Sequence, residues 1–216
     1  MNWFAHPAMM FAIEPSPFPK ITEIKPGIFQ FGDILIHKKE RNFSLPAQCN
    51  QTSGLVEYAL VHEMGKVHES LFRTRASPRL IHACMLLLKE SPQRDFFLNM
   101  QTNPESLPPL RTIEIFVEWE QNGTLYTREF SPMVLNQMEE RSLEGNSFVF
   151  TGSQVIEGVY LAEEDGSIIA IYHDNRATIN CKDLLSHSDD VWTANRKNMP
   201  PKDLPVTIRF QLPSLN

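Results

Sequence analysis

Residues 54–74, GLVEYALVHEMGKVHESLFRT, decide the fold class of this chain of 216 residues. Two runs within this stretch, residues 55–62 and 67–74, are rich in β-forming residues, and Met64-Gly65 lies between them. Because glycine suits the positive-φ position of a two-residue turn, this spacing predicts an antiparallel β-hairpin.

The predicted hairpin register sorts side chains onto two faces, because successive residues of a strand point to opposite sides. One face is expected to carry Tyr58, Leu60, His62, Val67, Glu69 and Leu71. The other is expected to carry Glu57, Ala59, Val61, His68, Ser70 and Phe72. His68 and Glu69 are neighbours in the sequence, but this register points them in opposite directions.

A helix is predicted directly after the hairpin, at residues 80–89. Ser77 followed by Pro78 is typical of a helix N-cap with proline at the first helical position, and Pro92 ends the helix. The apolar stripe of this helix follows i, i+3, i+4, i+7 spacing and consists of Ile81, Cys84, Met85 and Leu88.

Several other strands are marked by turn signals and by alternation. Residues 28–36 are expected to form a hairpin or a bent strand pair around Gly32-Asp33, and residues 42–47 a short strand that Pro46 places at a sheet edge. Residues 112–120 alternate strongly and lead into Asn122-Gly123, which is a strong hairpin signal.

The second half of the chain is expected to contain one more helix and a meander. Ser131-Pro132 repeats the cap-plus-proline signature and predicts a short helix at residues 133–143. The strands of the meander are expected at residues 147–156, 158–162, 167–173 and 206–212.

Strands joined mostly by hairpins imply an antiparallel sheet, and apolar helices must cover a face or an end of it. The expected fold is therefore α+β, predominantly antiparallel β and sandwich-like, with one or two helices packed on the sheet. One β-rich domain is expected over residues 26–216. Residues 1–25 form an apolar and then proline-rich lead-in, which is interpreted either as a signal-peptide remnant or as an apolar arm that packs on the domain.

Composition argues against two classes of partner. Lys and Arg total 20 against 26 Asp and Glu, a formal charge of −6, and an acidic surface repels the phosphates of nucleic acid. No apolar stretch reaches the ~20 residues that span a bilayer, so no integral membrane segment is expected. Cys49, Cys84 and Cys181 lack metal-site spacing; Cys84 is expected to be a buried thiol, and a Cys49–Cys181 disulfide stays an open alternative.

Four stretches carry a family resemblance: residues 54–74 continued by residues 77–88, FVEWE at 116–120, FVFTGS at 148–153 and DGSIIAIYHDNRATIN at 165–180. They resemble the bacterial YdjY-type domain family, over about residues 26–181. The resemblance implies no catalytic or binding residues, because the family has no established activity. Some relatives carry cysteine-rich iron–sulfur segments, which this sequence lacks, so no cofactor is expected. The proline-rich lead-in resembles that of exported relatives, which favours export to the periplasm or envelope over a cytoplasmic location.

Polar residues of the hairpin–helix unit are the candidate ligand-binding residues: His68, Glu69, Ser70 and His82. His68 beside Ser70 is the pairing of a base with a nucleophile. However, i, i+2 neighbours on a strand lie about 7 Å apart, so no catalytic residue is assigned, and the alternative is that both satisfy buried backbone groups. A metal site is not predicted either, because His62 and His68 are expected on opposite faces and zinc needs three or four converging ligands.

Two polar loops are weighed in the same way. Residues 151–153, Thr-Gly-Ser, are either a small polar binding loop or a strand break at Gly152. Residues 173–176, His-Asp-Asn-Arg, are interpreted as a charged turn.

Two functions are compatible with these features. The first is a non-catalytic binding or assembly module of the bacterial cell envelope, with an unidentified protein or small molecule as partner. The alternative is an enzyme or small-ligand binder that uses the His68/Ser70 face near His82. The sequence sets no oligomeric state.

Overall fold

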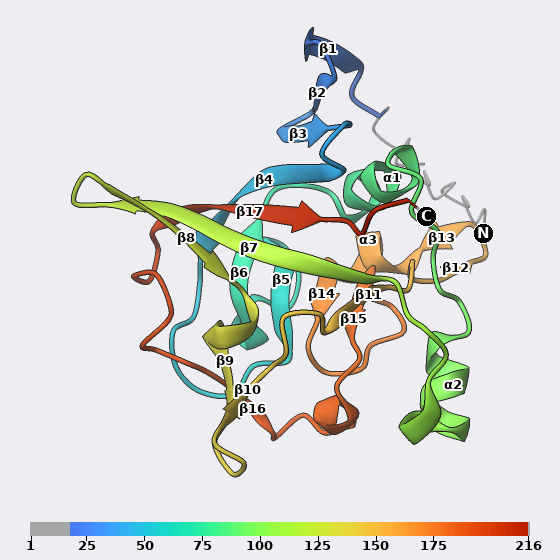
Figure 1. Ribbon diagram of the computed structural model, residues 1–216, viewed down its shortest axis with the longest axis vertical. Coiled ribbons are helices and arrows are strands. Elements are labelled where there is room, and N and C mark those ends of the chain that lie inside the picture. The colour runs from blue at the N-terminus through green and yellow to red at the C-terminus, as the bar shows by residue number, and fades with distance from the viewer. Residues whose placement is uncertain (1–17, 216) are drawn as a thin grey trace, which may run out of the picture.

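The computed structural model describes residues 18–215, which form a closed barrel of eight strands with further strands attached (Figure 1). In spatial order the barrel strands are β4 (Asn42–Cys49), β17 (Pro205–Gln211), β7 (Thr112–Gln121), β11 (Phe148–Phe150), β15 (Ile179–Cys181), β14 (Ser167–Ala170), β5 (Tyr58–His62) and β6 (Ser70–Thr74). The α+β class is confirmed. The sandwich-like arrangement was wrong, because β6 pairs back onto β4 and closes the sheet.

The predicted hairpin around Met64-Gly65 was also wrong, because β5 and β6 are parallel neighbours that pair Tyr58 with Ser70 and His62 with Thr74. The connection contains a 3-10 turn, η1 (Val67–Glu69), which takes His68 and Glu69 out of the strand. The face assignments that assumed an antiparallel register therefore do not hold.

Gly65 is required for close backbone approach and has no positive φ. A Cβ at this position would lie 2.7 Å from the carbonyl oxygen of Asp165 and 3.1 Å from Cα of Gly166. The glycine that suggested a hairpin turn therefore lets the β5–β6 connection pack against the start of β14.

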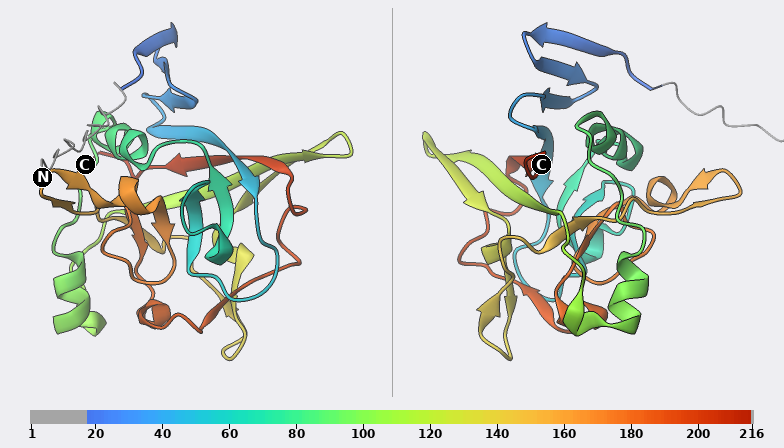
Figure 2. Two further views of the ribbon diagram at one scale, coloured as in Figure 1. Left: turned by 180° about the vertical axis from the view of Figure 1, so that it is seen from behind. Right: turned by 45° about the vertical axis from the view of Figure 1, so that its right-hand side comes forward.

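Two hairpins are confirmed. Strands β2 (Ile28–Phe31) and β3 (Ile34–His37) pair antiparallel, and β7 pairs with β8 (Thr124–Glu129) across a turn in which Asn122 and Gly123 have φ of 53° and 75°. Strand β1 (Ile21–Lys25) adds to β2, so pairing begins inside the predicted lead-in. The β1–β3 sheet and the β7–β8 hairpin both project from the barrel (Figure 2). The rest of the lead-in, residues 1–17, lies outside the described residues.

Strand β4 is central, not the edge strand that Pro46 suggested. One of its edges pairs with β17 over the whole strand, and the other pairs with β3 at residues 42–44 and with β6 at residues 48–49. Pro46 lies between these two partners, where a missing N–H interrupts no ladder. Its carbonyl accepts a hydrogen bond from Thr74 Oγ1 at 2.7 Å.

The helix predicted at residues 133–143 does not form. Ser131 Oγ donates to the carbonyl of Glu144 at 2.8 Å, and the Asn136 side chain accepts from the backbone of Met138 and Glu139, which turns the chain. The segment contains η3 (Ser131–Met133), β9 (Val134–Asn136) and β10 (Arg141–Ser142), and β9 pairs with β16 (Trp192–Ala194). The predicted meander was likewise wrong, because its strands are not neighbours: β11 pairs with β7 and β15, β14 with β15 and β5, and β17 with β4 and β7.

Three α-helices occur within residues 18–215: α1 (Pro78–Leu87), α2 (Phe96–Thr102) and α3 (Leu161–Asp165). Helix α1 confirms the prediction, since Ser77 Oγ accepts from the backbone of Arg79 and all four stripe residues are buried. Helices α2 and α3 were not predicted. Short elements complete the fold: β12 (Val155–Ile156), β13 (Val159–Tyr160), η2 (Pro104–Ser106) and η4 (Leu184–His187). No helix of this described part is long and apolar enough to cross a bilayer.

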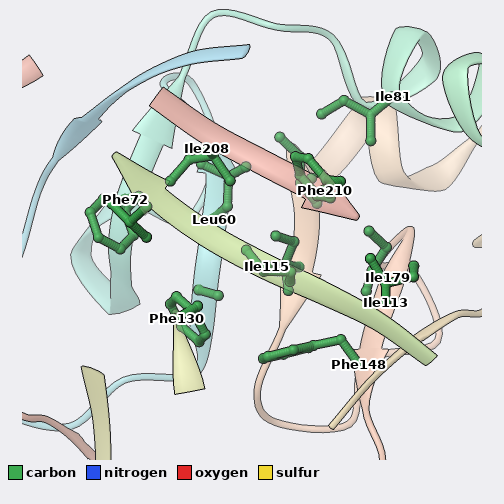
Figure 3. Close-up of a cluster of buried hydrophobic side chains, with 14 of the residues drawn as sticks. Leu60, Phe72, Ile81, Ile113, Ile115, Phe130, Phe148, Ile179, Ile208 and Phe210 are labelled. Atoms are coloured by element: carbon green, nitrogen blue, oxygen red, sulfur yellow. The ribbon is translucent and has the colours of Figure 1, made fainter. Parts of the chain in front are cut away.

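The core fills the barrel and continues under α1. Figure 3 shows Phe72, Ile115, Phe148 and Phe210 among side chains contributed by several barrel strands, and Ile81 of α1 belongs to the same cluster. Cys49, Cys84 and Cys181 are buried free thiols, so the Cys49–Cys181 disulfide is not formed. Burial raises the pKa of the Cys181 thiol to about 11.

The buried carboxylate of Glu90 links several segments at one end of the barrel through ion pairs. Glu90, only 2% exposed, pairs with Arg41 at 3.1 Å and with Arg111 at 2.7 Å. Arg41 Nε also donates to the carbonyl of Pro213 at 2.8 Å. The cluster therefore ties together the turn before β4, the end of α1, the start of β7 and the C-terminal tail.

Replacing this carboxylate should be costly. We expect Glu90→Ala to lower the free energy of unfolding by about 3–5 kcal/mol, because two guanidinium groups lose their buried partner. Urea denaturation measures the effect. The matched control is Glu120→Ala at an exposed position of β7, expected to change stability by no more than about 0.5 kcal/mol. Equal effects of the two substitutions would contradict the structural role given to Glu90.

Candidate functional site

The four candidate residues from the sequence lie in different surroundings. His68 is 74% exposed on η1, and its Nε2 lies 2.8 Å from Glu69 Oε1. Ser70 is fully buried, and its hydroxyl donates to the carbonyl of Phe72 at 2.7 Å. His82 lines a pocket that His68 does not reach. The structure thus brings His68 and Glu69 together but does not form the pairing of His68 with Ser70.

Glu69 lies close to a second carboxylate, that of Glu57. The backbone N–H of Glu57 donates to the carbonyl of Glu69 at 3.0 Å, which holds the two residues side by side. Burial and the neighbouring Glu69 raise the pKa of Glu57. Among residues 18–215, no group of three or more His, Cys, Asp or Glu side chains could hold a metal ion.

A pocket of about 960 Å³ lies where α1, the segment from Thr151 to Gly158 and the start of α2 meet. These elements come together on one side of the barrel (Figure 1). Its volume is within the range of small-molecule sites, about 300–1,000 Å³. Of the four candidate residues, His82 alone lines it.

Gly152 shapes the wall of this pocket. Its φ is +86°, and a Cβ there would lie 2.6 Å from Cβ of Pro92, so a larger residue is excluded on both counts. Its N–H donates to the carbonyl of Thr178 at 2.9 Å. The hydroxyl of the next residue, Ser153, donates to the carbonyl of Arg176 at 2.6 Å. These two hydrogen bonds attach the segment to the β14–β15 connection.

His82 sits in a chain of polar groups with aromatic neighbours. Its Nδ1 lies 3.0 Å from the Tyr160 hydroxyl, which lies 3.0 Å from Thr178 Oγ1, and its ring meets Phe150 edge-on at 5.0 Å. Burial lowers the pKa of His82, and the nearby charge of Arg94 lowers it further. A hydrogen bond to the backbone of Gly152 acts in the opposite direction, but the net effect is a lowered pKa. Burial raises the pKa of Tyr160 to about 12. Both groups are therefore neutral hydrogen-bonding groups near pH 7.

The charges that line the pocket are all positive. Arg79 and Arg94 both line it, and its lining within the described residues contains no Asp or Glu. Neither guanidinium takes part in an ion pair with residues 18–215. The backbone N–H of Arg79, by contrast, is bound by the Glu163 carboxylate at 3.0 Å.

A partly buried polar network connects to the residues that form the pocket wall. Lys66 Nζ lies 2.5 Å from the Tyr58 hydroxyl, which donates to Asp174 Oδ2 at 2.9 Å. Asn180 accepts from the backbone of Asp174 and donates to Thr151 Oγ1 at 2.9 Å, directly before Gly152. Residues 173–176 were predicted to be a charged turn. Through Asp174 they link the β5–β6 connection, the β14–β15 connection and the pocket wall.

A second pocket of about 690 Å³ adjoins the first and shares Phe97 and Asn175 with it. His173 lines it and meets Phe96 and Phe97 of α2 edge-on. Burial lowers the pKa of His173. His173 therefore packs, as a neutral ring, against the two phenylalanines of α2.

The residues that sequence reasoning missed are Arg79, Arg94 and Tyr160. Gly152 was recognised as a break, and that break marks the pocket wall. The two arginines carry no local signal, because Arg79 lies in the first turn of α1, Arg94 lies just before α2, and only the fold places both in the lining of one pocket. Tyr160 was expected in a strand, and nothing in its neighbourhood pointed to His82.

Comparison with models of known protein families, with curated proteins and with solved structures found no match to this chain. The YdjY-type resemblance stays a prediction from the quoted motifs. Function is therefore argued from the chemistry of the site.

The partly buried, neutral state of His82 is testable by its titration. The unfolded chain takes up the histidine proton near pH 6.5, whereas the folded chain does so only at lower pH, so His82 makes stability fall as the pH drops through that value. NMR of the imidazole signals, assigned by their loss in His82→Gln, should give a midpoint below about 6.5. A midpoint at or above that value would show that burial does not govern this ring.

Proposed function

We propose that this chain is a non-catalytic binding module whose ligand is a small organic molecule with an acidic group, held in the pocket that His82 lines. The observation that carries the proposal is the lining itself, which contains Arg79, Arg94 and no carboxylate among the described residues. Within this proposal His82 keeps the ligand-binding role predicted from the sequence, while His68, Glu69 and Ser70 have none.

The chemistry of the two arginines supports an anionic ligand. A guanidinium presents its donors in a fixed planar fork that matches the two oxygens of a carboxylate or the oxygens of a phosphate. Hydrogen bonds to charged groups contribute about 1.5–3 kcal/mol each, twice the value of neutral ones. His82 and Tyr160 add neutral hydrogen-bonding groups to the same pocket.

Binding is favoured over catalysis by the partners of the reactive side chains. The Ser153 hydroxyl is bound to a backbone carbonyl, and the raised pKa of Tyr160 keeps its hydroxyl protonated. His82 faces Tyr160 and not a nucleophile within hydrogen-bonding reach. These groups are suited to orienting a ligand.

Location in the bacterial envelope, with an unidentified partner, is part of the proposal and depends on the family resemblance and on the apolar N-terminus. That N-terminus lies outside the described residues. Fractionation of cells that express the gene with its native upstream sequence tests it: periplasmic or envelope recovery is expected, and cytosolic protein with an intact Met1 would contradict export.

The anion requirement is tested with two probes of equal size, benzoate and neutral benzamide, titrated calorimetrically into the full chain. Benzoate should bind more tightly, and Arg79→Gln and Arg94→Gln should each weaken its binding by about tenfold, the loss of one charge-assisted hydrogen bond. The matched control is Arg128→Gln on β8, an exposed arginine outside the pocket, which should leave binding unchanged.

Equal binding of benzoate and benzamide, or unchanged binding in both pocket variants, would exclude acid recognition at this site. Stability of each variant is measured in parallel by thermal denaturation. Because Arg94 is exposed and forms no ion pair with the described residues, its variant should stay folded.

A further inference from the structure

Exposed apolar side chains gather around the same pocket. Leu86 of α1 is 50% exposed, Ile156 of β12 is 53% exposed, and Val155 and Phe18 are likewise exposed while lining the pocket. We refer to these four residues as the apolar rim. They come from three separate parts of the chain, so their convergence is a product of the fold and not of one apolar run.

The β12–β13 hairpin has no place in the barrel. Its two strands form a sheet of their own and pair with no barrel strand, across a turn in which Glu157 and Gly158 both have positive φ. Val155 and Ile156 therefore contribute nothing to the main core and instead face water beside Arg79, Arg94 and His82. Apolar clusters of this kind, next to polar groups, mark sites of binding.

We infer that the ligand is an amphiphilic anion, a single alkyl chain that ends in a carboxylate and binds as a monomer. The inference rests on the proposed function, because the arginines must hold the acidic group. The inference adds the apolar half of the ligand, because Leu86, Val155 and Ile156 of the rim can pack against a flexible alkyl chain. A compact, fully polar anion would leave these side chains in water.

Chain length is the first readout, with butanoate, decanoate and uncharged decanol as probes, kept below micelle-forming concentrations. Each methylene removed from water strengthens binding by about fourfold, from about 0.8 kcal/mol per methylene. Decanoate should therefore bind at least about 50-fold more tightly than butanoate if three or more of its additional methylenes are buried. Calorimetry on the full chain measures the dissociation constants.

Rim variants are the second readout. Ile156→Ser and Leu86→Ser should weaken decanoate binding by about four- to tenfold each, with butanoate binding unchanged. Both positions are at least half exposed, so the variants should fold. Leu125→Ser, at an exposed position of β8 that is remote from the pocket lining, is the matched control and should change neither ligand's binding.

The outcomes separate this inference from the proposed function. If butanoate binds as tightly as decanoate and Arg94→Gln weakens the binding of both, the ligand is an anion but not an amphiphile, and the inference is overturned alone. If decanol equals decanoate and Arg94→Gln has no effect, acid recognition fails as well. Strong decanoate selectivity that both Arg94→Gln and Ile156→Ser reduce supports both.

A lipid bilayer presents the same chemistry as a free amphiphile, and vesicles distinguish the two sources. The full chain should not sediment with phosphatidylcholine vesicles that contain phosphatidylglycerol. Sedimentation that is abolished by Ile156→Ser, without binding of monomeric decanoate, would overturn the inference and identify the rim as a membrane-contacting surface.

Discussion

The hydrogen bonds that join the Tyr58 hydroxyl to Lys66 and Asp174 are the interactions on which the pocket-bearing side of this barrel depends. Parallel strands are ordinarily joined by a crossover of a dozen or more residues, often a helix. Here β5 reaches its parallel neighbour β6 through residues 63–69, and β14 reaches β15 through residues 171–178. Neither connection is long enough for the α-helix that usually makes such a crossover, and the first contains only the 3-10 turn η1. Lys66 comes from one connection and Asp174 from the other, so one buried hydroxyl ties both of them to β5.

The pocket follows from this arrangement. Asn180 carries the network from Asp174 to Thr151, and the next residue, Gly152, forms the wall against which His82 is placed. After the C-terminal end of α1, Glu90 fixes that end of the helix through its ion pairs with Arg41 and Arg111. Helix α1 is thus positioned at both ends, by its Ser77 cap and by the segment that contains Glu90. A rigid wall and a fixed helix are what a binding site needs in order to present its groups without paying for ordering them.

Local features of the fold were predictable, and non-local ones were not. The Ser77-Pro78 cap, the apolar stripe of α1 and the Asn122-Gly123 turn act over a few residues, and the structure confirms all three. Gly65 looked like a turn residue, but it is needed for contact with Gly166, a hundred residues later. The parallel pairing of β5 with β6 and the closure of β6 on β4 depend on such distant contacts. Of the residues in the proposed site, His82 was named from the sequence and stays a prediction, whereas Arg79, Arg94 and Tyr160 join it in one pocket lining only through the fold.

The central claim is that the pocket beside His82 binds the acidic end of an amphiphile and that the apolar rim binds its chain. Intermolecular nuclear Overhauser effects between decanoate and a methyl-labelled full chain test it most directly. The claim predicts contacts from the alkyl protons to the methyl groups of Leu86, Val155 and Ile156. Contacts to Leu125 of β8 or to Leu184 of η4, with none at the rim, would contradict it.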